Sequence, residues 1–229
     1  MVHFQQELRD LHERLREMGA LVASSIHKSV LCLTQHNEDH GQQVLRNESM
    51  INQMEMQIDD ITTTLLTLNQ PVARDMRMLV VALKISTDLE RMGDLAVNIV
   101  ARALTLIHQP DLDVTIDIEG MGAQVENMVL RCLDAFVKED TELARGVLLS
   151  DDVVDQTRNE IYETLTKVME RDPAKVRRAL ATMFIARNLE RIADHATNIA
   201  EDIIFLRSGI DVRHRREDLL ESAPASAES

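Results

Sequence analysis

Two segments of the sequence each place a glutamate, an aspartate and an asparagine four residues apart. They are DLERMGDLAVNI, which carries Glu90, Asp94 and Asn98, and NLERIADHATNIAEDI, which carries Glu190, Asp194 and Asn198. Residues four apart lie on one face of an α-helix, where two like charges cost roughly 0.2–0.5 kcal/mol. A face that serves only solubility usually sets a Lys or Arg four residues after a Glu, and these faces do not. A cation bound between the oxygens would remove the repulsion.

A second acidic pattern recurs at an earlier position in each half of the chain. The segments VLRNESMINQ and VLLSDDVVDQ align so that Glu48 matches Asp151 and Asn52 matches Asp155. The first copy continues with further acids, whereas the second has Arg158 and Tyr162 at the corresponding positions. Two different helices in each half therefore carry oxygen side chains away from their apolar faces, and these helices can face each other across the bundle surface.

The chemistry of these side chains is that of a site for a hard cation. Carboxylate and amide oxygens without cysteine suit Mg²⁺, Mn²⁺, Ca²⁺ or iron better than a zinc site with soft ligands. The predicted metal ligands are Glu48, Asn52, Glu90 and Asp94 in the first half and Asp151, Asp155, Glu190 and Asp194 in the second. The alternative is a solvated face, since acidic residues opposite an apolar stripe often bind nothing. Because Asn52 is uncharged, the first site is expected to be weaker or smaller.

Composition predicts that helices position these residues. Of the 229 residues, 7 are Gly, 4 are Pro, one is Tyr and none is Trp, whereas Leu, Ala, Met, Glu and Arg are abundant. Such a chain is poor in the turn and aromatic residues of β-sheets, so we predict an all-α fold. The formal net charge of −14 leaves no broad basic surface for phosphates and argues against nucleic acid as a partner.

The internal repetition indicates two tandem, homologous three-helix bundles. The prolines fall between periodic segments, and Asp172 followed by Pro173 predicts the N-cap of the last helix. We predict bundles over 1–109 and 116–208, a linker at 110–115, and a charged, disordered tail at 209–229. The expected helices span about 3–36, 40–68, 73–107, 116–138, 141–170 and 174–207.

The helical period also predicts which side of each helix is buried. In the last helix the core face comprises Ile185, Leu189, Ile192, Ala196, Ile199 and Ile203, with Asp202 placed among the outer polar residues. His195 is expected at a polar edge, off the acidic stripe. Gly93 and its counterpart Ala193 are small enough to allow a neighbouring helix to approach closely.

The cysteines, the N-terminus and the absence of known catalytic motifs in the sequence limit the possible compartments and functions. Cys32 and Cys132 form no CxxC pair, which predicts two reduced, buried thiols. The N-terminus lacks the regions of a signal peptide, and no run approaches the ~20 apolar residues of a membrane span, so we expect a cytoplasmic protein. The sequence contains no Walker loop, GxGxxG or Glu-x-x-His pair beside the acidic stripes. A metal-dependent enzyme, phosphatase-like or using carboxylate-bridged metal for oxygen chemistry, is the alternative to a binding protein.

The sequence closely resembles the PhoU family of phosphate-signalling regulators over nearly its whole length. The most specific strings are QPVARDMRMLVVALKISTDLERMGD and RNLERIADHATNIAEDIIFL. The resemblance implies paired three-helix bundles with metal clusters held by a Glu/Asp-x-x-x-Asp motif. This motif falls on Glu90 and Asp94, on Glu190 and Asp194, and on Asp151 and Asp155, whereas Glu48 and Asn52 depart from it.

The resemblance also implies the role of the protein. It predicts a non-enzymatic negative regulator of phosphate uptake and of the phosphate-starvation response. Such an adaptor would contact a phosphate ABC transporter and a sensor histidine kinase at the cytoplasmic side of the membrane, and would form a homodimer. The bound metal would be Fe, Mg, Mn or Zn. Neither the residues nor the resemblance decides among these four.

Overall fold

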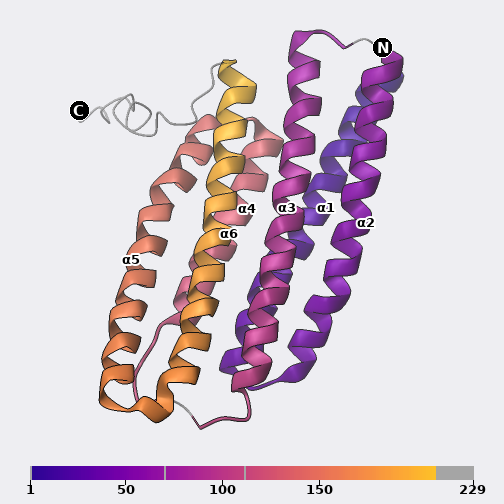
Figure 1. Ribbon diagram of the computed structural model, residues 1–229. Helices are drawn as coiled ribbons and strands as arrows, with labels where there is room; N and C mark the ends of the chain where they lie inside the picture. The colour runs from indigo at the N-terminus through magenta and orange to yellow at the C-terminus, as the bar shows by residue number, and fades with distance from the viewer. Residues whose placement is uncertain (1, 70, 111, 210–229) are drawn as a thin grey trace, which may run out of the picture.

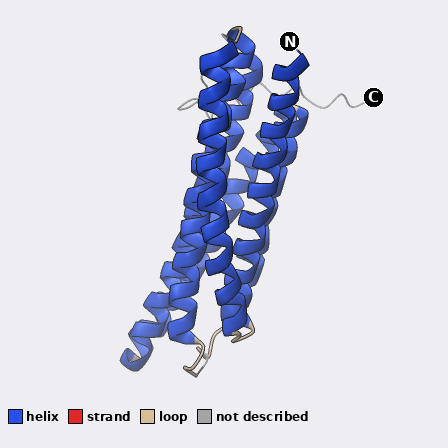
Figure 2. Ribbon diagram, turned by 90° about the vertical axis from the view of Figure 1, so that its right-hand side faces the viewer, coloured by secondary structure: helices blue, strands red, loops and turns tan. Residues whose placement is uncertain are grey.

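The computed structural model describes residues 2–69, 71–110 and 112–209, and this part of the chain contains helices and no strands (Figures 1 and 2). The α-helices are α1 (Val2–Thr34), α2 (Glu38–Asn69), α3 (Ala73–Leu106), α4 (Ile118–Lys138), α5 (Thr141–Arg171) and α6 (Val176–Ser208). A short 3₁₀ helix, η1 (Pro173–Lys175), precedes α6. The all-α prediction is confirmed, and the helix limits agree with the predicted ones to within two residues. The tail from residue 210 onward lies outside the described residues.

Short polar side chains set the limits of the later helices. Asp117 accepts a hydrogen bond from the backbone N–H of Gly120, and Asp140 accepts from the N–H groups of the first turn of α5. Asp172 caps the last helical segment as predicted, with its carboxylate accepting from Ala174 N at 3.0 Å. These contacts satisfy N–H groups that have no partner inside a helix, which is why the turns occur at these residues.

The helices form two three-helix bundles that lie side by side along their length (Figure 1). Successive helices in each bundle are antiparallel: in Figure 1, α1, α2 and α3 run down, up and down, whereas α4, α5 and α6 run up, down and up. The bundles meet where α3 packs against α6 and where α1 packs against α4. The buried apolar residues form one continuous core that spans both halves, with Ile85 of α3 and Ile192 of α6 among its fully buried members.

The helices α3 and α6 lie against each other along the boundary between the halves and run antiparallel. Lys84 contacts Asp202 near one end of this seam, and Arg102 lies over the ring of Phe184 near the other. Leu89-Glu90-Arg91 of α3 aligns with Leu189-Glu190-Arg191 of α6, so the seam has an approximate twofold relation between equivalent residues. No helix in the described part of the chain is long and apolar enough to cross a membrane.

Candidate functional site

The predicted ligands of the first half lie on α2 and α3, which pack directly against each other. Glu48 and Asn52 project from α2 and Glu90 and Asp94 from α3. Gly93 is buried, and a Cβ atom at this position would lie 3.2 Å from Cδ1 of Ile51 on α2. The absence of a side chain therefore lets the two helices approach closely beside the acidic residues, as the sequence predicts.

Carboxylates in this first set repel one another. Burial raises the pKa of Glu90, and the charges of Asp94 and Glu55 raise it further. Burial also raises the pKa of Glu55, with Asp59 adding to the effect. Arg91 offsets part of this repulsion, but within the described residues neither Glu90 nor Asp94 forms an ion pair. The first half thus collects negative charge without an equivalent cation.

Asn52 supplies a neutral oxygen to the same set. Its Nδ2 donates a hydrogen bond to Oε1 of Glu48 at 2.7 Å, whereas its Oδ1 is buried and accepts no hydrogen bond. A buried carbonyl oxygen without a partner is costly, and coordination of a hard cation would satisfy it. Together with the carboxylates it gives a donor set that fits such a cation.

The donor groups are near one another but are not yet gathered around one point. Among the residues that the structure describes, no three His, Cys, Asp or Glu side chains form a metal-binding group. Binding would require the carboxylates to turn toward a common centre, and for exposed side chains such as Asp94 this is a change of rotamer. The metal sites therefore stay a prediction.

The corresponding set in the second half lies on α5 and α6 and contains a cation of its own. Nη1 of Arg158 lies 2.9 Å from Oε1 of Glu190, and its Nη2 lies 3.4 Å from Oδ1 of Asp155. Burial raises the pKa of Glu190, as does the charge of Asp194, whereas Arg158 lowers it. Asp151 is buried beside this set. In the second half, therefore, the guanidinium of Arg158 joins the carboxylates of Asp155 and Glu190.

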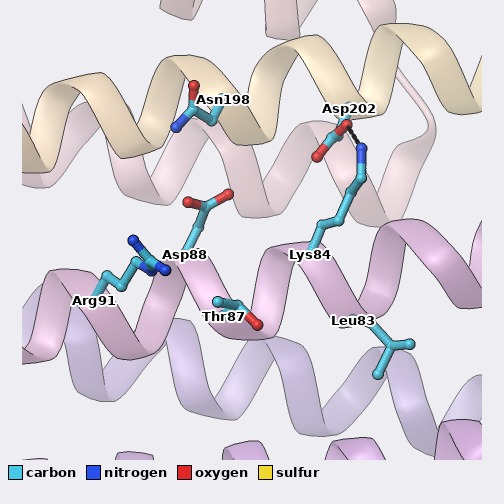
Figure 3. Close-up of a pocket in the computed structure, with 7 residues that line it drawn as sticks. All are labelled: Leu83, Lys84, Thr87, Asp88, Arg91, Asn198 and Asp202. Atoms are coloured by element: carbon cyan, nitrogen blue, oxygen red, sulfur yellow. Dashed lines mark hydrogen bonds and ion pairs between the residues drawn. The ribbon is translucent and has the colours of Figure 1, made fainter.

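A groove runs along the seam between the two halves (Figure 3). Lys84, Asp88 and Arg91 line it from α3, and Asn198 and Asp202 line it from α6. The placement of Asp202 on the outer polar side was wrong: the residue is buried, and its Oδ1 lies 2.6 Å from Nζ of Lys84. The reason is that α3 covers the side of α6 that the helical period alone assigns to solvent.

His195 lies on the same seam, off the acidic stripe as predicted. Its Nδ1 lies 2.8 Å from Oδ1 of Asp88, so the two halves share a second polar contact. Sequence reasoning did not identify Lys84 and Asp88 as partners of α6. When α3 and α6 are placed antiparallel, Lys84 faces Asp202 and Asp88 faces His195. These pairs of opposite or hydrogen-bonding side chains were the sequence signal for the contact.

The outer end of the stripe also differs between the halves. Asn98 lines a depression together with Glu90, Asp94 and Arg191, whereas Asn198 lines the groove toward Asp88. Arg191 forms no ion pair with these carboxylates among the described residues. Cys32 and Cys132 are buried and form no disulfide, as the sequence predicts.

The sequence matches the PhoU domain family twice, over residues 15–103 and 118–203. The phosphate-specific transport system accessory protein PhoU homolog of Pseudomonas putida is 37% identical over 92% of this chain and 83% of its own length. The homolog of Caulobacter vibrioides is 36% identical over 93% of this chain and 94% of its own length.

Solved structures agree with the observed arrangement of helices. PhoU from Pseudomonas aeruginosa superimposes with a TM-score of 0.87 at 36% identity, covering 90% of this chain and 100% of that one. The phosphate transport system regulatory protein PhoU from Streptococcus pneumoniae superimposes with a TM-score of 0.85 at 25% identity, covering 91% and 99%. The tandem arrangement of helical bundles is therefore shared with these proteins.

Proposed function

The chain belongs to the PhoU family, and on this premise we propose that it is a non-enzymatic, metal-binding regulator of phosphate transport. The names of its relatives in Pseudomonas putida and Caulobacter vibrioides, which describe accessory proteins of a phosphate-specific transport system, support an accessory and regulatory role. The regulatory protein of Streptococcus pneumoniae, with the same fold, supports it too.

The proposed partners are a phosphate ABC transporter and a sensor histidine kinase. In this proposal the protein works as an adaptor at the cytoplasmic side of the membrane and keeps the phosphate-starvation response silent when phosphate is plentiful. It does so as a homodimer. An adaptor must bring two membrane proteins together without itself being one, and the described helices are consistent with that position.

The observation that carries metal binding is the uncompensated donor set between α2 and α3. Glu48, Asn52, Glu90 and Asp94 would hold a divalent cation or iron, with Glu55 beside them. The unpaired Oδ1 of Asn52 and the raised pKa of Glu90 both favour this set. A bound cation would supply the positive charge that these side chains lack and would fasten α2 to α3.

The metal proposal is tested on full-length protein stripped of metal with a chelator. Addition of Mn²⁺, Mg²⁺ or Fe²⁺ should raise the melting temperature, since a ligand that binds only the folded state at a hundredfold excess over Kd stabilises it by about 2.7 kcal/mol. Replacement of Glu90 by Gln and Asp94 by Asn keeps the shape and should abolish the rise. An unchanged melting temperature, with no metal recovered by elemental analysis, would refute metal binding.

The partner proposal is tested by purifying tagged protein from phosphate-replete and phosphate-starved cells. Recovery of the transporter and the kinase from replete cells, with weaker recovery from starved cells, is the expected result. Recovery of neither protein under either condition would contradict the adaptor role. Light scattering of the purified protein tests the homodimer.

A metal-dependent enzyme is the competing function, because clustered carboxylates also serve catalysis. A generic phosphoester assayed with Mn²⁺ or Mg²⁺ distinguishes the two. The adaptor predicts no turnover above that of metal alone. Robust turnover that the Glu90→Gln substitution removes would instead assign a hydrolytic activity to the same side chains.

A further inference from the structure

We infer that Arg158 is a built-in cation that takes the place of a metal ion in the second half, so that only the first half binds one. This inference rests on the proposed metal binding by the first half. It concerns a difference between two homologous sets of side chains that share the Glu-x-x-x-Asp motif on α3 and α6.

The repeat alignment shows one position at which an acid of the first half becomes a base in the second. Matching Glu48 with Asp151 and Asn52 with Asp155 also matches Glu55 with Arg158. The exchange turns an acid into a base one helical turn after the shared ligand position. Since the later segments keep the same Glu-x-x-x-Asp motif in both halves, the change in charge at this position distinguishes one half from the other.

The geometry places the guanidinium where a shared cation would act. Arg158 projects from α5 and contacts Asp155 on its own helix and Glu190 on α6, with one nitrogen for each carboxylate. The side chain of Arg158 is 25% exposed and that of Glu190 is 18% exposed, so the contact is largely shielded from water. The ion pair thereby joins α5 to α6, as the proposed metal would join α2 to α3.

The same position in the first half has the opposite effect. Glu55 places a negative charge near Glu90, whereas Arg158 places a positive charge 2.9 Å from the carboxylate of Glu190. An arginine remains charged at every physiological pH. A divalent cation bound to Glu190 and Asp155 would lie within about 5 Å of it, and the repulsion between them would weaken binding by about a hundredfold or more.

The test uses full-length protein in which the first set has been disabled by E90Q and D94N. This background, freed of metal and titrated with Mn²⁺, should bind none. Addition of R158Q should create Mn²⁺ binding that depends on Glu190. Addition of R158K is the matched control, because lysine keeps the charge, and it should create no binding. Calorimetry and elemental analysis measure the stoichiometry.

Two results would overturn the inference. One is that R158Q creates no Mn²⁺ binding. The other is that the background still binds Mn²⁺ and loses it when Glu190 and Asp194 are replaced by Gln and Asn. Failure of the proposed function gives a different result. The parent protein would then bind no Mn²⁺, while binding by R158Q alone would still support the role of Arg158 in the second half.

The reciprocal substitution gives a second readout that does not depend on the folding of R158Q. E55R places a guanidinium in the first set at the equivalent position. It should weaken Mn²⁺ binding by the otherwise intact parent by about a hundredfold or more, for the same electrostatic reason. E55Q, which removes one charge without adding the opposite one, should weaken it far less. Equal affinities for E55R and the parent would contradict the inference.

Discussion

The ammonium of Lys84 on α3 lies 2.6 Å from the carboxylate of Asp202 on α6, and this ion pair joins the two halves of the chain. The twofold relation of the seam places Phe184 and Arg102 at the equivalent positions. There the guanidinium carbon of Arg102 lies 5.3 Å from the centre of the Phe184 ring. The two ends of one interface thus use different interactions between equivalent residues, an ion pair at one end and a cation–π contact at the other.

Removal of the cation from this ion pair should weaken the seam. Asp202 is 9% exposed and Lys84 is 35% exposed, so the carboxylate depends on the pair more than the ammonium does. We expect K84A to lower the free energy of unfolding by about 1–2 kcal/mol, because a largely buried charge loses its counter-ion. Urea unfolding followed by circular dichroism measures the change.

R102A is the matched control at the other end of the seam. It removes an exposed cation–π contact, which is worth about 0.5–1 kcal/mol. If K84A destabilises the protein no more than R102A does, the ion pair contributes nothing special to the junction of the halves. Combination of K84A with D202N, which also removes the buried charge, should recover part of the lost stability.

Substitutions of the two acidic sets should have opposite effects on metal-free protein. E90Q with D94N removes two charges that repel each other and form no ion pair among the described residues, so stability should stay equal or rise by roughly 0.2–0.5 kcal/mol. E190Q with D194N removes the nearer of the two carboxylates that contact the largely buried Arg158 and should cost about 1–2 kcal/mol. Urea unfolding in the presence of a chelator at neutral pH measures both variants.

The contrast between the variants is the informative quantity. Equal changes in both would mean that Arg158 compensates nothing in the second half, or that the first half carries a cation of its own. E190Q alone separates the contribution of the ion pair from that of Asp194. It should account for most of the loss, because Glu190 is the carboxylate that accepts from Nη1.

The pH dependence of stability should reveal the carboxyl of Glu90. Its pKa is raised in the folded protein by burial and by the neighbouring acids. The folded state therefore holds this proton more tightly than the unfolded state, and stability falls as pH rises from the ordinary pKa of a glutamate toward the raised one. In metal-free protein E90Q should match the parent at about pH 4 and exceed it at about pH 7.

Metal should reverse this dependence. Deprotonated carboxylates bind the cation, so the stabilisation by Mn²⁺ should grow over the range in which the metal-free parent loses stability. Unfolding curves of parent and E90Q at several pH values, with and without Mn²⁺, test both parts. A difference between E90Q and the parent that does not vary with pH would show that Glu90 titrates as an ordinary exposed glutamate.

The helices and their caps were predictable because they depend on local chemistry. The apolar period identifies the buried face of α6, and every residue predicted for that face is fully buried. Asp172 caps its segment for the same local reason. The period gives the side of a helix on which a residue lies, but not which neighbour covers that side. The burial of Asp202 follows from the packing of α3, which no single helix encodes.

The acidic stripes show the same limit from the functional side. Their spacing was sufficient to propose a site in each half and to notice that Arg158 replaces an acid. It was not sufficient to show that the guanidinium reaches Glu190, since that contact depends on the distance and rotation between α5 and α6.

A side chain at position 93 should disturb the first site without touching any proposed ligand. The buried Gly93 allows α3 to lie against Ile51 of α2, which is itself fully buried. In G93V the added atoms cannot be accommodated without moving Ile51 or the helices, and overpacking of this kind costs about 1–3 kcal/mol. Because the ligands lie on both helices, the displacement should also weaken Mn²⁺ binding.

G93A is the matched control for G93V, because it adds only one methyl group at the contact with Ile51. Alanine raises helix propensity by about 1 kcal/mol relative to glycine, which offsets much of the tight contact with Ile51. We therefore expect G93A to stay close to the parent in stability and in Mn²⁺ affinity, and G93V to lose both. If G93V is destabilised but binds Mn²⁺ as tightly as the parent, the ligands of α2 and α3 do not share one cation, and the metal would have to be held by one helix alone.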